Sequence, residues 1–503
     1  MVFKITFLTI KKRVALIFHP FFIVLFFIPL FSKADFSFTV QNEAAYLDFL
    51  NLQVNKGQSL IAQDLKENPK NGISIYIANY GDVIRIFLSE DAKLYKQLSK
   101  NEDARIDKLQ ALEKDSPYYR FTQAEVKLQW AFVKLKMGDE LSAAMGLRSA
   151  YKLLEENMRL YPDFVPNKKT MGLLNVLIGS IPSNYNWVLS LIGMKGDIDK
   201  GIEQLNEVSK DNNPFRFEAS IIKVLVENYI VHANKGKIDD AVKLYQDNSD
   251  NILICYLYAA ILTKNSRGME AMVIINSRPV NADLIYFPQM DLILGELSLY
   301  QGEYSIARSY YTNFLSHFKG KNTLKDTYFK IFLTYWLNDE EALAMPYLDK
   351  ILNNGRELYD SDKYAQRTAK NKEIPNKVLT KIRLYTDGGY YTKAFDLIKT
   401  LTLNQFITKR EKLEYLYRSA RLFHKTGQVN DAIDYYTKTI ELSKVETFYF
   451  APNSALQLGY IYQSQNEKEE ARKQFNLALS YKNYEYKNSI DNKAKAALNE
   501  LGK

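Results

Sequence analysis

The stretch Pro452–Ser480, PNSALQLGYIYQSQNEKEEARKQFNLALS, carries the pattern that decides the fold. Its small and aromatic residues stand at a characteristic spacing: Leu458, Gly459, Tyr462, Ala471, Phe475 and Ala478. This spacing predicts two antiparallel helices that cross where Gly459 and Ala471 are small. Tyr462 and Phe475 then fill the space between this helix pair and the next one.

The same pattern occurs upstream, which indicates internal repeats. The alanines at the crossing, Ala394, Ala432 and Ala471, lie 38 and 39 residues apart, slightly more than the ideal period of roughly 34 residues for a repeat of this kind. Three earlier copies contain the residues Ala420, Phe423, Gly427, Ala432 and Tyr436; Tyr385, Gly389, Tyr391, Ala394 and Ile398; and Gly295, Gly302, Tyr304, Ala307, Tyr311 and Phe314. Longer loops between repeats account for the extra residues.

Prolines support the same frame. Pro288, Pro375 and Pro452 are each predicted at the first position of the first helix of a unit, where the missing N–H would be unpaired anyway. Degenerate copies extend toward the N-terminus, with Ala131, Gly138, Ala143 and Leu147 in one and Gly236, Ile238, Ala241 and Tyr245 in another.

This spacing resembles the tetratricopeptide-repeat superfamily over most of residues 120–485, most specifically over 288–480. The resemblance implies an all-α fold, an α-solenoid of antiparallel helix pairs wound into a right-handed superhelix. A looser likeness covers residues 120–340 and resembles the tetratricopeptide repeat protein 39 family, which has no assigned enzymatic activity. It rests on Gly172-Leu173-Leu174-Asn175, Ile181-Pro182, Leu191-Ile192-Gly193 and Gly196-Asp197 through Gly201 to Leu205.

We expect seven segments along the chain. They are a signal peptide at 1–34, an N-terminal helical cap at 35–115, a degenerate helical-repeat domain at 116–285, repeats at 286–352, a connecting segment at 353–374, repeats at 375–485 and a C-terminal capping helix at 486–503.

The N-terminus predicts export. Lys11-Lys12-Arg13 precedes the apolar run Val14–Phe31, and Ser32-Lys33-Ala34 fits a cleavage site after Ala34. We therefore expect a periplasmic or extracellular protein with no stable membrane insertion, while an uncleaved N-terminal anchor is the lesser alternative.

Charge and cysteine content exclude several classes of protein. The net charge of +9 falls to +4 without residues 1–34, which hold five bases and no acid, and no dense stripe of Lys and Arg remains. We therefore expect no nucleic-acid partner.

Cys255 is the only cysteine, so a disulfide framework is excluded, and its apolar surroundings predict a buried, inert thiol.

The sequence offers no catalytic, cofactor or metal motif. The four histidines, His19, His232, His317 and His424, have no metal-ligand spacing, and no P-loop, H-E-x-x-H or G-x-S-x-G pattern occurs. Acid pairs such as Glu340-Glu341 belong to polar helix faces. We therefore expect a protein that is not an enzyme and needs no cofactor.

The repeat geometry predicts where a partner binds. First helices line the concave side of such arrays, and their non-packing positions include Arg383, Tyr417, Arg421, His424, Asn453, Tyr460 and Gln463. Arg383 and Arg421 occupy equivalent positions, which suits a basic ladder for an acidic peptide or carboxylate, unless both are merely solvated or paired with neighbours.

These observations favour an exported, non-catalytic scaffold that binds a protein or peptide in its groove. The alternative is a carbohydrate- or nutrient-binding protein of the bacterial cell envelope, although such proteins usually need a lipid-attachment cysteine, which does not follow the apolar run here. The first function rests on architecture rather than on a site.

Overall fold

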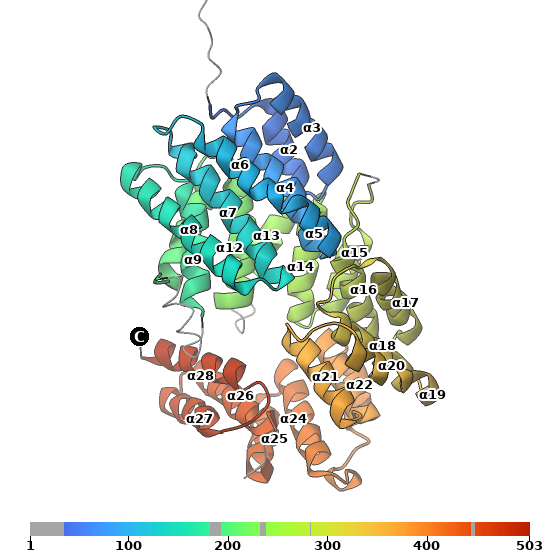
Figure 1. Cartoon of the computed structure of the whole chain (residues 1–503). Coiled ribbons are helices and arrows are strands. Elements are labelled where there is room, and N and C mark those ends of the chain that lie inside the picture. The colour runs from blue at the N-terminus through green and yellow to red at the C-terminus, as the bar shows by residue number, and fades with distance from the viewer. Residues whose placement is uncertain (1–34, 182–192, 232–237, 282, 444–447, 503) are drawn as a thin grey trace, which may run out of the picture.

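The computed structural model describes residues 35–181, 193–231, 238–281, 283–443 and 448–502. Throughout these ranges the secondary structure is helical and no strand occurs, which confirms the all-α fold. Consecutive helices form antiparallel pairs that follow a curved path from the blue N-terminal block to the red C-terminal helices (Figure 1). The predicted signal peptide, His19 and His232 lie outside the described residues.

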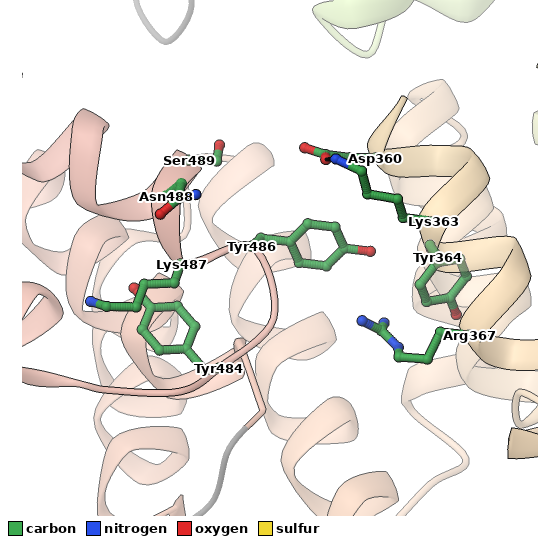
Figure 2. A pocket seen from close by; sticks show the side chains of 9 residues that line it. All are labelled: Asp360, Lys363, Tyr364, Arg367, Tyr484, Tyr486, Lys487, Asn488 and Ser489. Carbon is green, nitrogen blue, oxygen red and sulfur yellow. Dashed lines mark hydrogen bonds and ion pairs between the residues drawn. The ribbon is translucent and has the colours of Figure 1, made fainter. Parts of the chain in front are cut away.

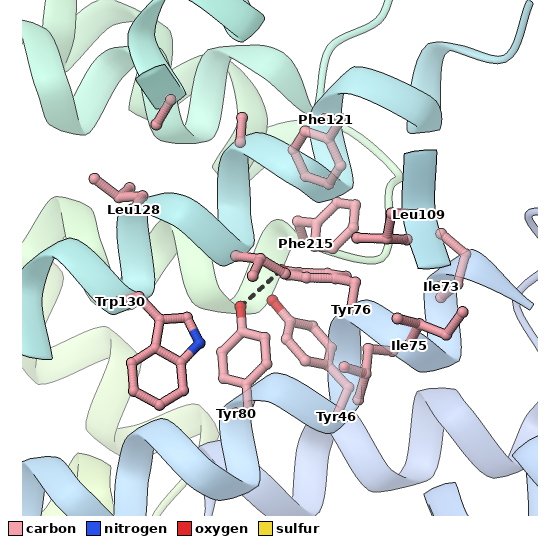
Figure 3. Packing of buried hydrophobic residues seen from close by; sticks show 14 of the residues in the cluster. Tyr46, Ile73, Ile75, Tyr76, Tyr80, Leu109, Phe121, Leu128, Trp130 and Phe215 are labelled. Atoms are coloured by element: carbon pink, nitrogen blue, oxygen red, sulfur yellow. Dashed lines mark hydrogen bonds between the residues drawn. The ribbon is translucent and has the colours of Figure 1, made fainter. Parts of the chain in front are cut away.

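The N-terminal block consists of the helices α2 (Val40–Leu50), α3 (Val54–Glu67), α4 (Gly72–Ser89), α5 (Ala92–Leu98), α6 (Lys100–Gln110), α7 (Pro117–Met137), α8 (Glu140–Leu160) and α9 (Asn167–Gly179). Local chemistry sets the ends of α7, because Ser116 caps its first turn, Pro117 is its first residue and Gly138 ends it in the left-handed region. Large side chains fill the core of the block, among them Tyr46, Tyr76, Phe121, Trp130 and Phe215 (Figure 3).

A charged cluster lies inside this core. Lys169 is only 2% exposed, and its ammonium contacts the carboxylates of Glu125, at 2.8 Å, and Glu218. The other donors are hydroxyl groups, from Tyr46 and Tyr80 to Glu218 and from Tyr76 and Thr170 to Glu125. Burial raises the pKa of Glu125 against the opposing effect of Lys169. A fully paired buried cluster of this kind favours one arrangement of the surrounding helices.

The second block comprises α11 (Ile198–Lys210), α12 (Arg216–Val226), a π-helical turn (Glu227–Val231), α13 (Asp239–Asp247), α14 (Ile252–Lys264) and α15 (Gly268–Asn276). The glycines of the looser sequence likeness have a packing role here. Gly172 of α9 and Gly201 of α11 face each other, and a Cβ on Gly201 would lie 2.6 Å from the Gly172 carbonyl oxygen. Only glycine permits this close crossing.

The N-terminal helices contact more than their sequence neighbours. The backbone N–H of Ile252 donates to Asn51 Oδ1 at 2.9 Å, and that of Ile285 donates to the carbonyl of Leu52 at 3.0 Å. Residues 35–115, expected as a cap at the end of the array, are therefore also packed along the side of the second block.

The C-terminal half contains α16 (Pro288–Gln301), α17 (Tyr304–His317), α18 (Leu324–Trp336), α19 (Glu341–Ala344), α20 (Pro346–Asn353), α21 (Asp360–Asn371), α22 (Lys377–Gly388), α23 (Tyr391–Ile398), a 3-10 turn (Leu403–Gln405), α24 (Lys409–Lys425), α25 (Val429–Ser443), α26 (Phe450–Ser464), α27 (Lys468–Ser480) and α28 (Lys487–Leu501). The pairs α16–α17, α22–α23, α24–α25 and α26–α27 are the predicted hairpins. In the last pair Gly459 lies against the ring of Phe475, so the small residue at the crossing makes room for the aromatic one.

Two details of the predicted frame need correction. Only Pro288 begins its helix, whereas Pro375 lies just before the N-cap Asn376 and Pro452 is the third residue of α26. Both positions still avoid the loss of an intrahelical hydrogen bond, because the first-turn N–H groups have no partner within the helix.

The segment 353–374, expected to be a connection, contains helix α21. Most residues of α21 are charged or polar, but one narrow face is buried against α18 and α20. This face includes Ala365, Thr368 and Ala369. Small residues give a weak hydrophobic signal, so the periodicity was easy to miss.

Cys255 is buried, as expected, and its thiol lies 3.3 Å from the carbonyl of Ser249. Burial raises the pKa of this thiol, which disfavours the reactive thiolate. Among the helices of the described ranges, none is both long and apolar enough to cross a lipid bilayer.

Candidate binding groove

The first helices of the C-terminal repeats lie beside one another and form one wall. Helix α22 contacts α16 and α24, and α24 contacts α26. We call the inner surface of α16, α18, α21, α22 and α24 the groove. Its charged residues come from units that are far apart in sequence.

A pocket of about 450 Å³ lies in the groove. It is lined by Glu296, Leu299, Tyr300, Asp326, Phe329, Lys330, Leu333, Asp360, Ser361, Tyr364, Arg383, Leu384, Asp387 and Tyr486. We call it the central pocket. It is built mainly from polar and aromatic side chains of α16, α18, α21 and α22.

One side of the central pocket is acidic. The ammonium of Lys330 contacts Asp326, at 3.0 Å, and Glu296. Burial alone would lower the pKa of Lys330, but the two carboxylates raise it well above its ordinary value. Two acids therefore share the ammonium of Lys330, and the charge of Arg383 also acts on Asp326.

Arg383 lies on the other side of the central pocket and differs from the arginine at the equivalent position of the next repeat. The half-buried guanidinium of Arg383 forms no hydrogen bond and no ion pair with any described residue. Arg421 instead pairs with Asp387 at 2.9 Å, and this carboxylate raises the pKa of Arg421. Of the two arginines predicted to bind an acidic ligand, Arg421 therefore already has an ion-pair partner and Arg383 has none among the described residues.

The remaining candidates divide into two groups. Tyr417 is buried, and its hydroxyl accepts a hydrogen bond from Asn453 Nδ2 at 2.6 Å. His424 lies 3.5 Å from the hydroxyl of Tyr436. Burial lowers the pKa of His424, and the charges of Lys425 and Arg421 lower it further. Tyr417, predicted to face a partner, therefore packs in the core between α24, α25 and α26, whereas His424 and Asn453 are only half-buried.

Tyr460 and Gln463 are not part of this wall. The ring of Tyr460 packs edge-on against Phe475 of α27, with 5.4 Å between the centroids. Gln463 Nε2 lies 3.5 Å from a carboxylate oxygen of Glu500 on α28. Because α28 packs on α26 and α27, this end of the array turns these two side chains toward the last helices.

Three lysines on α14, α24 and α28 form no ion pair with the described part of the chain. Burial lowers the pKa of Lys425 and of Lys493, and neither residue forms a hydrogen bond or ion pair with the described part of the chain. Lys264 of α14 also has a lowered pKa, through burial and through the charge of Lys493.

The C-terminal segment closes one side of the groove. Glu485 lies 3.1 Å from Arg367 and 3.3 Å from Arg410. The ring of Tyr486 extends from this segment toward Tyr364 and Arg367 of α21, beside a smaller pocket of about 280 Å³ (Figure 2). Tyr486 and Tyr364 line both this pocket and the central pocket.

Sequence reasoning missed the acids of the groove and the contribution of α21. Asp387 could have been predicted from the sequence, because it follows Arg383 by one helical turn and therefore lies on the same helix face. The sequence could not predict the other three, because only the packing of separate units brings Glu296, Asp326 and Tyr364 to the same pocket as Arg383.

No group of three or more His, Cys, Asp or Glu side chains within the described ranges is arranged to hold a metal ion. No family model matches the chain, and no curated protein matches it at a significant level.

Several solved structures show a loose likeness. The crystal structure of the APC/C hetero-tetramer Cut9–Hcn1 is 12% identical over 93% of this chain and 100% of that chain, with a TM-score of 0.26. The structure of Naa15/Naa10 bound to HypK-THB is 13% identical over 92% of this chain, which spans 64% of that chain, with a TM-score of 0.25. The human IFIT1 dimer with PPP-AAAA is 13% identical over 92% and 95% of the two chains, with a TM-score of 0.23.

Proposed function

We propose that this chain is an exported, non-catalytic scaffold that binds an acidic segment of a protein or peptide in the groove. The observation that carries the proposal is the unpaired guanidinium of Arg383 in the wall of the central pocket. Burial alone would lower the pKa of Arg383, but Tyr364, Asp387 and Glu414 outweigh it and raise the pKa, so the guanidinium stays charged. A carboxylate from a ligand would supply the acceptor that the Arg383 donors lack among the described residues and form a charge-assisted pair with them.

The basic residues beyond the central pocket support the same ligand class. Lys425, Lys493 and His424 all have lowered pKa values, and burial is the largest cause in each case. An anionic ligand along α24 and α28 would stabilise their protonated forms. An acidic group placed against one of these bases therefore gains more than a neutral group would at the same position.

The spacing of charges favours a peptide over a nucleic acid. Acids alternate with the bases along the groove, with Glu296 and Asp326 on one side and Asp387 beside Arg421. A regular polyanion would bring phosphates against these carboxylates, whereas a peptide places its acidic side chains only where the wall is basic. Export rests on the charge and apolar pattern of residues 1–34 alone.

The test is fluorescence anisotropy with peptides that differ only in charge, an acidic one containing Glu and Tyr and its Gln-substituted counterpart. We expect the acidic peptide to bind more tightly to the wild type, and Arg383→Gln to weaken it by about tenfold, since one charge-assisted hydrogen bond is lost. Arg472→Gln is the matched control, because Arg472 lies on α27 and pairs only loosely with Glu469, at 4.0 Å. Equal binding of both peptides, or an equal loss in the control, would contradict the proposal.

A further inference from the structure

The segment that joins α27 to α28 lies against the groove. We call its residues Tyr484–Tyr486 the strap. Tyr486 lines both the central pocket and the smaller pocket, and its ring extends toward Tyr364 and Arg367 of α21 (Figure 2). The residue before it, Glu485, is an acid. The strap therefore brings a carboxylate and an aromatic ring to the groove in which we expect an acidic peptide.

The carboxylate of Glu485 lies where the carboxylate of a ligand would be expected. Its Oε1 lies 3.1 Å from Arg367 Nη2 and accepts a hydrogen bond from Arg410 Nη1 at 3.3 Å. Arg367 belongs to α21 and Arg410 to α24, so one acid of the strap joins two helices of the groove. A peptide that binds both arginines must first displace Glu485, because its carboxylate already lies between them.

The contacts of Glu485 are incomplete. Its second oxygen, Oε2, is buried and accepts no hydrogen bond from the described residues, and two nitrogens of Arg367, Nε and Nη2, donate none. Buried donors and acceptors that lack hydrogen bonds are unfavourable. Nε and Nη2 form one edge of the guanidinium, so a carboxylate that approaches this edge with both oxygens would satisfy both donors. Glu485 does not reach that arrangement.

The backbone around the strap is held in an unfavourable conformation. Tyr486 has a φ of 61° and Asn483 a φ of 57°, which is the left-handed region that residues with a Cβ rarely adopt. Tyr486 is also the N-cap of α28, but its side chain forms no capping hydrogen bond. Displacement of the strap would relieve this strain, which makes the closed state easier to open than its contacts alone imply.

We propose that the strap is an internal substitute for the ligand, and that the groove binds a peptide in which an acidic residue is directly followed by an aromatic one. The peptide displaces the strap, its carboxylate pairs with Arg367 and Arg410, and its ring takes the place of Tyr486 beside Tyr364. This inference rests on the proposed function, because it names the residues that the acidic segment carries.

The test is fluorescence anisotropy with two labelled peptides of the same composition. In the adjacent peptide Glu is directly followed by Tyr, and in the separated peptide two glycines lie between them. We expect the adjacent peptide to bind the wild type more tightly than the separated one. Glu485→Gln should tighten its binding by about tenfold, because the apparent affinity rises with the fraction of molecules in which the strap is open. Adding Arg410→Gln to Glu485→Gln should abolish that gain, since the peptide then loses one of its two arginines.

Glu469→Gln is the matched control. It also removes one acid near the C-terminal end, but Glu469 is largely exposed on α27 and lies 4.0 Å from Arg472, away from the groove arginines. It should bind both peptides as the wild type does. Hydrogen exchange gives a second readout, because the backbone amides of residues 481–489 should exchange faster when the adjacent peptide is added to the wild type. Thermal melting establishes that each variant remains folded.

Three results would overturn the assignment of the strap and leave the proposed function in place. They are equal affinities for the two peptides, unchanged affinity in folded Glu485→Gln, and unchanged exchange of residues 481–489 on binding. Absence of binding of both peptides to the wild type and to every variant would overturn the proposed function as well.

Discussion

Asp387 engages Arg421 at 2.9 Å, although Arg383 lies one helical turn before Asp387 on the same helix. Asp387 therefore forms its ion pair with Arg421 of the next repeat and not with Arg383 of its own helix. This pairing across repeats decides which of two equivalent arginines is available to a ligand.

Asp387→Asn should increase the affinity for acidic peptides several-fold. The substitution removes a negative charge from the groove and frees Arg421, so that two arginines rather than one face the ligand. Fluorescence anisotropy with the acidic peptide measures the change. Weaker binding in a folded Asp387→Asn variant would show that the acid positions Arg421 for the ligand rather than competing with it. The cost in stability should be about 1 kcal/mol, since the pair is only partly buried.

Binding of an acidic peptide should strengthen as the pH falls from about 7.5 to 5.5, the range in which histidine titrates. The pKa of His424 is lowered in the free protein by burial and by Lys425 and Arg421. A bound anion favours the protonated imidazole, so protonation and binding promote each other. In His424→Gln the slope of affinity against pH should be reduced, and an unchanged slope would assign it to another group.

The same lowered pKa predicts how stability depends on pH. Because the folded-state pKa of His424 lies below its unfolded value, the contribution of this group is present above the unfolded value of about 6.5 and is lost as the pH falls through the folded pKa. Urea unfolding of the wild type and of His424→Gln at a series of pH values measures this. The wild type should lose more stability on acidification than the variant does.

Lys169→Met should destabilise the N-terminal block by about 3–5 kcal/mol. Removing this ammonium leaves the carboxylates of Glu125 and Glu218 together in a buried site. Lys168→Met provides the comparison at the next residue, because Lys168 pairs with Glu207 near the surface and should cost at most about 1 kcal/mol. Urea unfolding gives both values, and similar values for the two variants would contradict the assigned role of the buried cluster.

Gly389→Ala should be more destabilising than Gly427→Ala. Both glycines have a positive φ, of 81° and 78°, so an alanine at either position costs about 1 kcal/mol or more in backbone strain. A Cβ on Gly389 would in addition collide with the carbonyl oxygen of Ser266, whereas nothing lies within 4 Å of the equivalent position at Gly427. The difference in melting temperature between the two variants measures the contact between α22 and the turn before α15.

The repeat pattern was sufficient to predict the helix pairs of the C-terminal half. The small residues of the repeat act locally. Turns or close packing require glycine at Gly302, Gly389 and Gly459, and helix crossings require alanine at Ala394, Ala432 and Ala471. The helix pairs can therefore be predicted from the sequence. The connection expected at 353–374 was wrong, because α21 buries alanine and threonine rather than large apolar residues.

The candidate site was predictable only in part. Of the residues counted along first helices, Arg383 lines the central pocket, whereas Tyr417 is buried. Tyr460 and Gln463 turn toward α27 and α28. Repeat counting assumes that every unit has the same neighbours, and the last unit has a capping helix instead.

The sequence by itself determined that the described chain is helical and paired, because spacing, small residues and turn glycines act within about forty residues. Only the tertiary structure decided how the charged side chains are paired. Lys169 pairs with Glu125 and Glu218, and Arg421 pairs with Asp387, whereas Arg383 forms no ion pair with a described residue. Each outcome depends on which side chains from distant helices are brought within a few ångströms.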